Sequence, residues 1–159
     1  MSDTRQYRDL LTELEPLADD QPWADQRQWR TRSHVGTEGG VTVVDLHDLG
    51  AKLARRAVRQ VLTARPTAGA VIFVHGRGRH TLGAGPVLKG VVTSELRRAT
   101  AEDAGVVRPL GAARTAWIAD PEIAPRSVRG GMGLGARVLL ALLVLALVVA
   151  VAQSLGLFG

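Results

Sequence analysis

The chain has 159 residues, which allows one domain of about 80 to 120 residues with extensions. It contains no cysteine, and this excludes both a disulfide framework and a thiolate metal site. Residues 1–40 hold 5 Lys/Arg against 8 Asp/Glu, a net charge of −3, whereas residues 41–159 hold 15 against 7, a net charge of +8. The basic body suggests a polyanionic partner, and the alternative is an Arg-rich soluble surface without one.

Residues 1–40 are expected to form an acidic arm that begins with one short helix. The helix is predicted by apolar residues at helical spacing, namely Tyr7, Leu10, Leu11, Leu14 and Leu17. Pro16 should disturb the end of this helix. From residue 18 to residue 40 the composition is polar and loop-like, with Trp23 and Trp29 either anchoring the arm onto the domain or contacting a partner. No basic stretch leads into an apolar one here, so no signal peptide is predicted at this end.

The domain is expected to span residues 41–120 and to start with a strand over Val41–His47. Alternation along this strand puts Asp45 and His47 on the same face, close to its C-terminal end. A helix is predicted over residues 49–64, followed by a turn at residues 65–69. One face of this helix is basic and is either a phosphate track or an ordinary solvated surface; it comprises Lys52, Arg55, Arg56 and Arg59.

The stretch from Val71 to Lys89 is predicted to form a strand, a glycine-rich loop and the start of a second helix. The loop reads HGRGRH, and Pro86 is well suited to the first turn of a helix. Free backbone N–H groups and the positive end of a helix form a natural seat for phosphate. The residues expected to hold a phosphate here are Gly76, Arg77, Gly78, Arg79 and Lys89.

Strand, helix and strand in this order predict a right-handed parallel βαβ unit. Because parallel strands end at the same edge of the sheet, Asp45 and His47 should emerge beside the glycine-rich loop, where His75 and His80 also lie. Each residue alone has an ordinary structural explanation, since a strand-end Asp often caps a turn. The convergence of two distant segments favours a functional site.

The C-terminal third is predicted to contain a hairpin, a linker and a membrane span. Residues 106–110 and 116–119 are the hairpin strands, and the Pro- and Gly-rich residues 121–133 are the linker. Residues 134–158 are predicted to form a transmembrane helix, because the 22 residues from Val138 onward carry no charge and a helix of that length spans roughly 30 Å. Arginines precede this stretch, so the positive-inside tendency places the domain in the cytoplasm of a single-pass membrane protein. The alternative is that residues 138–144 form a buried last strand.

The segments VVDLH, VIFVHGRGRH and GPVLKGVV, in this order, resemble the Smr (small MutS-related) domain. The resemblance covers about residues 41–98, and YRDLLTELEPL is similar to the segment that precedes the domain in many bacterial members. It implies a small α/β sandwich with a βαβα core, akin to the C-terminal domain of translation initiation factor three. It also implies a function that acts on nucleic acids, since several members cleave or nick RNA or DNA. Asp48 stands where the family usually has a glycine, which places a further negative charge beside the site.

These residues allow a chemical account of phosphodiester cleavage. His47 is the expected general base with Asp45 orienting it, and His80 or His75 is the expected general acid. No metal ligand is assigned. Magnesium or manganese remains open, because Asp45 and Asp48 are the only candidate carboxylates and magnesium usually takes two or more.

The predicted function is a membrane-anchored endonuclease acting on RNA or DNA. One alternative is a non-catalytic membrane-tethered module that binds nucleic acid or ribosomes. Another is a membrane adaptor whose acidic arm recruits a protein. A nucleotide-binding enzyme is less favoured, because the loop lacks the G-K-[S/T] ending of a P-loop.

Overall fold

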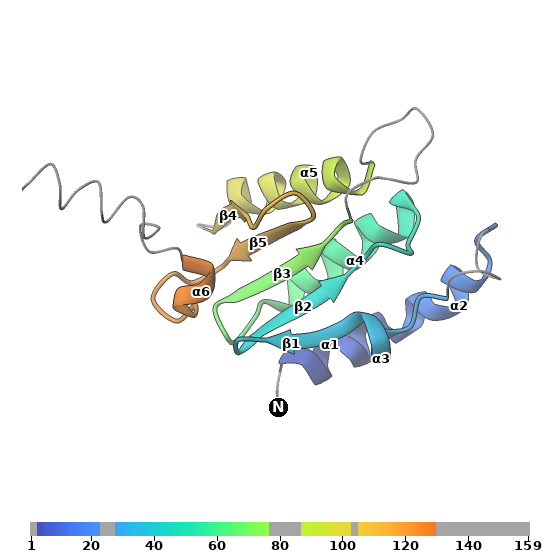
Figure 1. Cartoon of the computed structure of the whole chain (residues 1–159), viewed down its shortest axis with the longest axis horizontal. Helices are drawn as coiled ribbons and strands as arrows, with labels where there is room; N and C mark the ends of the chain where they lie inside the picture. The colour runs from blue at the N-terminus through green and yellow to red at the C-terminus, as the bar shows by residue number, and fades with distance from the viewer. Residues whose placement is uncertain (1–2, 23–27, 77–86, 103–104, 130–159) are drawn as a thin grey trace, which may run out of the picture. The chain divides into compact units, whose positions relative to one another are not determined.

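The computed structural model describes residues 3–22, 28–76, 87–102 and 105–129, which belong to one compact unit over Met1–Arg129. The fold is mixed α/β and contains a five-stranded sheet of order β1-β2-β3-β5-β4 (Figure 1). The strands are β1 (Val35–Glu38), β2 (Val41–Asp45), β3 (Ala70–Val74), β4 (Val106–Pro109) and β5 (Arg114–Ile118). β2 and β3 are parallel, and the other three neighbouring pairs are antiparallel.

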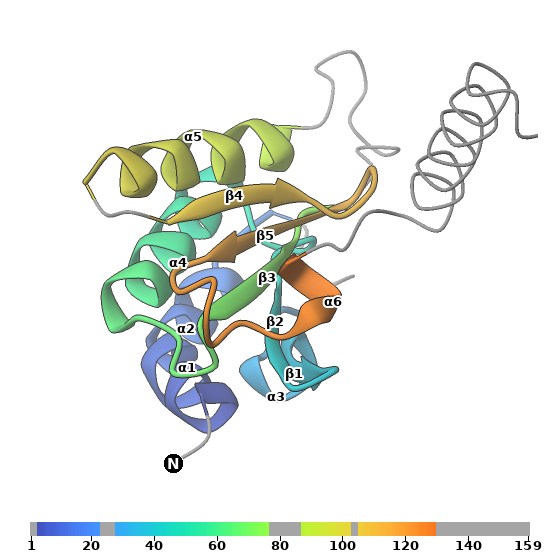
Figure 2. The ribbon, with the colours of Figure 1, turned by 90° about the vertical axis from the view of Figure 1, so that its left-hand side faces the viewer.

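Helices lie on both sides of this sheet (Figure 2). They are α1 (Asp3–Leu11), α2 (Glu15–Asp19), α3 (Thr31–His34), α4 (Ala51–Ala64), α5 (Val87–Glu102) and α6 (Arg126–Arg129), with a 3₁₀ turn at Thr12–Leu14. Side chains alternate along each strand, so the two faces of the sheet belong to two separate hydrophobic cores. Val71 and Phe73 of β3 belong to the core on the face covered by α1, α4 and α5. Ala70 and Ile72 belong to the core on the face covered by α6. The α1, α4 and α5 side holds the larger core.

The predicted βαβ unit and the predicted hairpin are confirmed. β2, α4 and β3 form a parallel crossover in which Asp45 pairs with Val74, so both strands end at the same edge. β4 and β5 form the antiparallel hairpin, although the second strand begins at Arg114 instead of residue 116. α4 begins two residues later than expected, because Gly50 is its extended N-cap residue.

The described residues of the first forty are part of the domain, whereas the sequence suggested a separate arm. β1 pairs with β2 through the two-residue turn Gly39-Gly40, where both φ angles are positive (56° and 81°) as this hairpin turn requires. α1 places Tyr7 and Leu11 fully inside the larger core. The Asp3 carboxylate accepts hydrogen bonds from the backbone N–H groups of Thr67 (3.0 Å) and Ala68 (2.9 Å). These bonds fix the start of α1 to the turn that precedes β3. An apolar helix face of this size is stabilised by burial and does not remain an exposed arm.

The predicted linker also begins inside the fold. The Asp120 carboxylate accepts the N–H of Glu122 (2.8 Å), and the following turn buries Ala124 and Val128 in the core on the α6 side. Residues 130–133 of that linker and the predicted membrane span 134–158 lie outside the described residues. Within the part of the chain that is described, no helix is long and apolar enough to cross a bilayer.

Candidate active site

Asp45 and His47 form a hydrogen-bonded pair at the end of β2. The Asp45 Oδ1 atom lies 2.7 Å from His47 Nδ1 and also accepts the His47 backbone N–H at 3.0 Å. A strand-end Asp that accepts the N–H two residues later is a common turn device, and here the same oxygen also holds the imidazole. Leu46 between them is fully buried, whereas the His47 side chain is 44% exposed. The predicted common face of Asp45 and His47 is confirmed, and the ring is accessible to a substrate.

The end of β3 lies directly beside this pair. The Leu46 N–H donates to the Val74 carbonyl at 2.8 Å, which continues the strand pairing up to the two motifs. Gly76 has a φ of +70°, and a Cβ atom placed on it would lie 3.7 Å from the Cβ atom of His47. The D-L-H segment and the start of the HGRGRH segment are therefore neighbours, as the parallel topology predicted.

Lys89 is exposed in the first turn of α5, and its part in a phosphate seat stays a prediction. Arg77, Gly78, Arg79 and His80 lie outside the described residues, so their part in that seat stays a prediction.

His75 is buried beneath this edge and does not present its ring to solvent. The residue is 3% exposed, with Nε2 3.2 Å from the Thr115 hydroxyl of β5 and Nδ1 3.2 Å from the Gly76 carbonyl oxygen. Burial lowers the pKa of His75, and the nearby charge of Lys89 acts in the same direction. We therefore assign His75 a structural role, in place of the general-acid role that its position in the sequence suggested.

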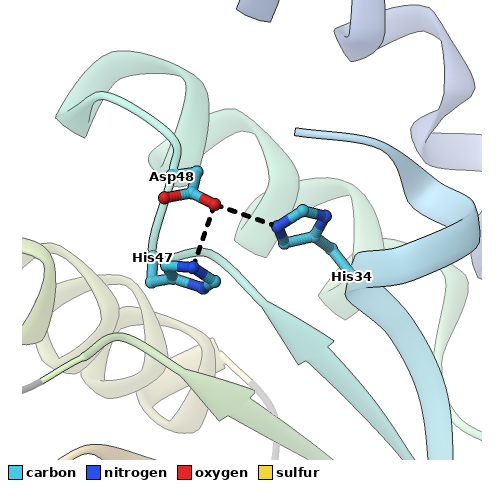
Figure 3. Close-up of side chains that lie close together, drawn as sticks. All are labelled: His34, His47 and Asp48. Atoms are coloured by element: carbon cyan, nitrogen blue, oxygen red, sulfur yellow. Dashed lines mark hydrogen bonds and ion pairs between the residues drawn. The ribbon is translucent and has the colours of Figure 1, made fainter. Parts of the chain in front are cut away.

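Two further side chains complete the site, and the sequence did not identify them as a group. Asp48 is buried, and its Oδ2 atom lies 2.9 Å from His47 Nε2 and 3.2 Å from His34 Nε2 (Figure 3). His34 is the last residue of α3, in a segment expected to be a polar loop. The Gly39-Gly40 turn was the signal that could have found it, since the hairpin register pairs Val35 with Val44 and brings the residue before β1 to the end of β2.

Trp29 packs beside the His34 ring and is hydrogen-bonded to the end of β2. It is fully buried, its Nε1–H donates to the Asp45 carbonyl at 2.7 Å, and its ring lies 5.7 Å from that of His34. The His34 and His47 rings are 5.3 Å apart. The anchoring interpretation is confirmed for Trp29, while Trp23 lies outside the described residues.

The two carboxylates constrain the protonation of His47. Its Nδ1 faces Asp45 and its Nε2 faces Asp48, and carboxylate oxygens are acceptors only. Both contacts are hydrogen bonds only when both ring nitrogens carry a proton. In this arrangement His47 can donate a proton, and it can act as the predicted base only after Nε2 leaves Asp48.

The basic face of α4 is largely used by the fold. Arg55 and Arg59 contact the buried carboxylate of Glu95 on α5 at 3.2 and 2.7 Å, and Arg56 contacts Glu13 at 2.6 Å. These ion pairs join α4 to its neighbours, which favours the structural interpretation of this face over a phosphate track.

Comparison with known proteins adds no relative. No protein-family model matches the chain, and neither the curated proteins nor the solved structures contain a match. The basis for a function is therefore the geometry of the site.

Proposed function

We propose that this chain is a nucleic-acid endonuclease of the Smr type that acts on RNA or DNA phosphodiesters. The observation that carries the proposal is the exposed Asp45–His47 pair beside Gly76, at the carboxyl edge of β2 and β3. The β2-α4-β3-α5 order agrees with the βαβα core that the resemblance implies, and the D-L-H segment lies next to Gly76, at the start of the second motif.

In this proposal the chain supplies charge for the phosphate and a proton for the leaving oxygen. Lys89, with Arg77 and Arg79 of the adjoining loop, neutralises the phosphate, and Gly76 lets the backbone approach it. His47, held by Asp45, donates a proton to the leaving oxygen. The proton of the attacking water or hydroxyl then passes to solvent, because a ring protonated at both nitrogens cannot accept it. His47 serves as the base only after it has lost its Nε2 proton and turned from Asp48, with His80 as the donor to the leaving oxygen.

The test is cleavage of labelled single-stranded RNA, structured RNA and branched DNA by the full chain, with magnesium, manganese or a chelator. We expect His47→Ala to lower the cleavage rate by about 10²- to 10⁴-fold, the usual contribution of a proton-transfer group. Asp9→Asn is the matched control, because Asp9 is exposed on α1 and lies outside the site. Cleavage by His47→Ala at the rate of the unmodified chain would rule out this site as the catalytic one.

A second candidate function is a binding module that holds nucleic acid or ribosomes without cutting. The observation that favours it is the contact of Asp48 with His47 Nε2, which occupies the nitrogen that a general base needs. Binding without cleavage in any metal condition would identify this class. The adaptor hypothesis uses Trp23 and Trp29 as contacts for a protein partner. Trp29 is fully buried, so it cannot be one of these contacts.

We also propose that residues 134–158 anchor the chain to a membrane, with the domain on the cytoplasmic side. The support is the uncharged stretch from Val138 to Gly159 and the arginines at 126, 129 and 137 before it. Deletion of residues 135–159 should convert a protein that sediments with membranes into one that stays in the supernatant. A full-length chain that already stays in the supernatant would contradict the anchor.

A further inference from the structure

Three side chains from two segments converge at the end of β2 in a pattern typical of metal ligands. One ring nitrogen each from His34 and His47 and a carboxylate oxygen of Asp48 all lie within 4.8 Å of one another. Figure 3 shows both rings directed at Asp48 Oδ2, at 3.2 Å and 2.9 Å. Ligand atoms about 2.0–2.1 Å from a tetrahedral zinc ion are about 3.3 Å apart. Both measured separations are within about 0.5 Å of that spacing.

The second nitrogen of the His47 ring is held by a carboxylate oxygen, as in most metal-binding histidines. His47 Nδ1 lies 2.7 Å from Asp45 Oδ1, whereas His34 Nδ1 lies 3.0 Å from the Arg30 carbonyl oxygen and 3.2 Å from the Arg30 backbone nitrogen, so it faces both an acceptor and a donor. Metal-binding histidines nearly always donate this second N–H to a carboxylate or a backbone carbonyl, which leaves the other nitrogen for the ion. The contact between Asp45 and His47 Nδ1 is therefore a second observation that favours a metal site, separate from the convergence of His34, His47 and Asp48.

The surroundings keep two of the three groups in place and leave one side open. The side chains of His34 and Asp48 are 10% and 9% exposed, whereas that of His47 is 44% exposed. Gln21 ties the Asp48 loop to the N-terminal helices, since its Oε1 accepts the Gly50 N–H at 2.5 Å. Three protein ligands with an accessible fourth position are the arrangement of catalytic zinc sites, while structural zinc sites are closed by four.

We propose that His34, His47 and Asp48 bind one zinc ion, with its remaining position open on the solvent side of His47. Imidazole suits zinc and other late transition metals, whereas magnesium prefers oxygen ligands in octahedral geometry. An ion on Nε2 excludes a proton from that nitrogen, so binding to a protonated ring releases that proton. Metal binding itself does not rest on the proposed nuclease. An ion on Nε2 excludes proton transfer by that nitrogen, so in the zinc-bound chain His47 is a ligand and not the proton-transfer group proposed above.

The test is a calorimetric titration of the chelator-treated full chain with zinc chloride, without nucleic acid. We expect one zinc ion per chain, with a heat that depends on the ionisation enthalpy of the buffer because protons are released. His34→Gln, His47→Gln and Asp48→Asn keep the size and polarity of each side chain, and each should weaken binding at least about tenfold. Asp45→Asn removes only the partner of a ligand and should weaken binding by about 10- to 100-fold. Asp9→Asn is the control that should bind zinc as the unmodified chain does.

A spectroscopic readout separates loss of a ligand from loss of the fold. Cobalt(II) in the site should give visible absorption bands that change in Asp48→Asn while the circular dichroism of the chain is unchanged. The proposal is overturned if zinc fails to bind, if Asp48→Asn binds it with unchanged affinity, or if binding is lost in His80→Gln and retained in His34→Gln. Zinc binding without cleavage would refute the nuclease alone, and cleavage without zinc binding would refute the metal site alone.

Discussion

Two carboxylates act on the two nitrogens of His47 in different ways. Asp45 belongs to the strand and accepts both the ring Nδ1–H and a backbone N–H, so it sets the orientation of the ring. Asp48 is buried and lies 2.9 Å from Nε2, so it places a carboxylate oxygen against the second ring nitrogen. The side chain that departs from the Smr pattern is therefore the one that joins His47 to His34.

The buried His75 gives a prediction about acid stability. Its pKa is lowered in the folded chain, chiefly by burial, so the unfolded chain binds more protons once the pH falls below its ordinary value of about 6.5. The stabilisation is complete above that pH and is lost as the pH falls toward the lowered pKa. We expect the free energy of unfolding, measured with urea from about pH 7.5 to about pH 5, to decrease by at most about 1.4 kcal/mol per pH unit for this proton. His75→Gln should reduce this slope, and an unchanged slope would show that other groups cause the decrease.

At the scale of the element, α1 is a core helix that the sequence presented as part of an arm. Leu11 is fully buried in the larger core, whereas Leu17 at the end of the same apolar pattern is 38% exposed. We expect Leu11→Ala to cost about 2–5 kcal/mol of unfolding free energy and Leu17→Ala to cost about 0.5 kcal/mol or less. Denaturant titration of both variants measures the difference. Small and equal losses of unfolding free energy in both variants would contradict the placement of α1 in the core.

The ion pairs between α4 and α5 give a second prediction at this scale. Arg59 donates two hydrogen bonds to the Glu95 carboxylate, at 2.7 and 3.1 Å, and the pKa of Glu95 is lowered mainly by them. Arg59→Ala should lower the denaturation midpoint and leave nucleic-acid affinity unchanged, because the guanidinium is used within the fold. Lys52→Ala, on the same helix, is the control and should leave the midpoint unchanged. A large loss of affinity in Arg59→Ala would revive the phosphate-track interpretation of this face.

At the scale of the whole molecule, charge is separated along the chain but not between separate domains. The acidic residues 1–40 contribute β1 and α1 to the same compact unit as residues 41–129. Part of the opposite charge is paired inside it, as in the contacts of Arg114 with Glu38 and of Arg56 with Glu13. The net positive charge therefore does not measure how much of the surface is available to a polyanion.

The salt dependence of binding tests which charges contact nucleic acid. Arg77→Ala combined with Arg79→Ala should weaken binding to every sequence and flatten the slope of log affinity against log salt by about 2, because two phosphate contacts are lost. Fluorescence anisotropy at several salt concentrations measures this slope. Arg5→Ala combined with Arg32→Ala is the matched control, since both side chains are exposed in the N-terminal segment. The same slope in both double variants would show that the loop after Gly76 is not the phosphate seat.

The sequence determined those parts of the fold that depend on local periodicity and chain direction. Alternation along the predicted strand Val41–His47 and the short crossover to the strand from Val71 were sufficient to predict the parallel pair and the meeting of Asp45, His47 and Gly76, although β2 ends at Asp45. The hairpin of β4 and β5 followed from two short apolar runs around a glycine turn. Both depend on neighbours in sequence or on one short connection, which a pattern can specify.

The tertiary structure alone decided the composition of the site and the extent of the domain. His34 reaches Asp48 only because β1 pairs with β2, and β1 is a four-residue edge strand too short for periodicity to reveal. His75 became a core residue because β5 packs beside β3 and places Thr115 against its ring. Contacts between segments far apart in the chain arise from packing of the whole core, and no local pattern records them.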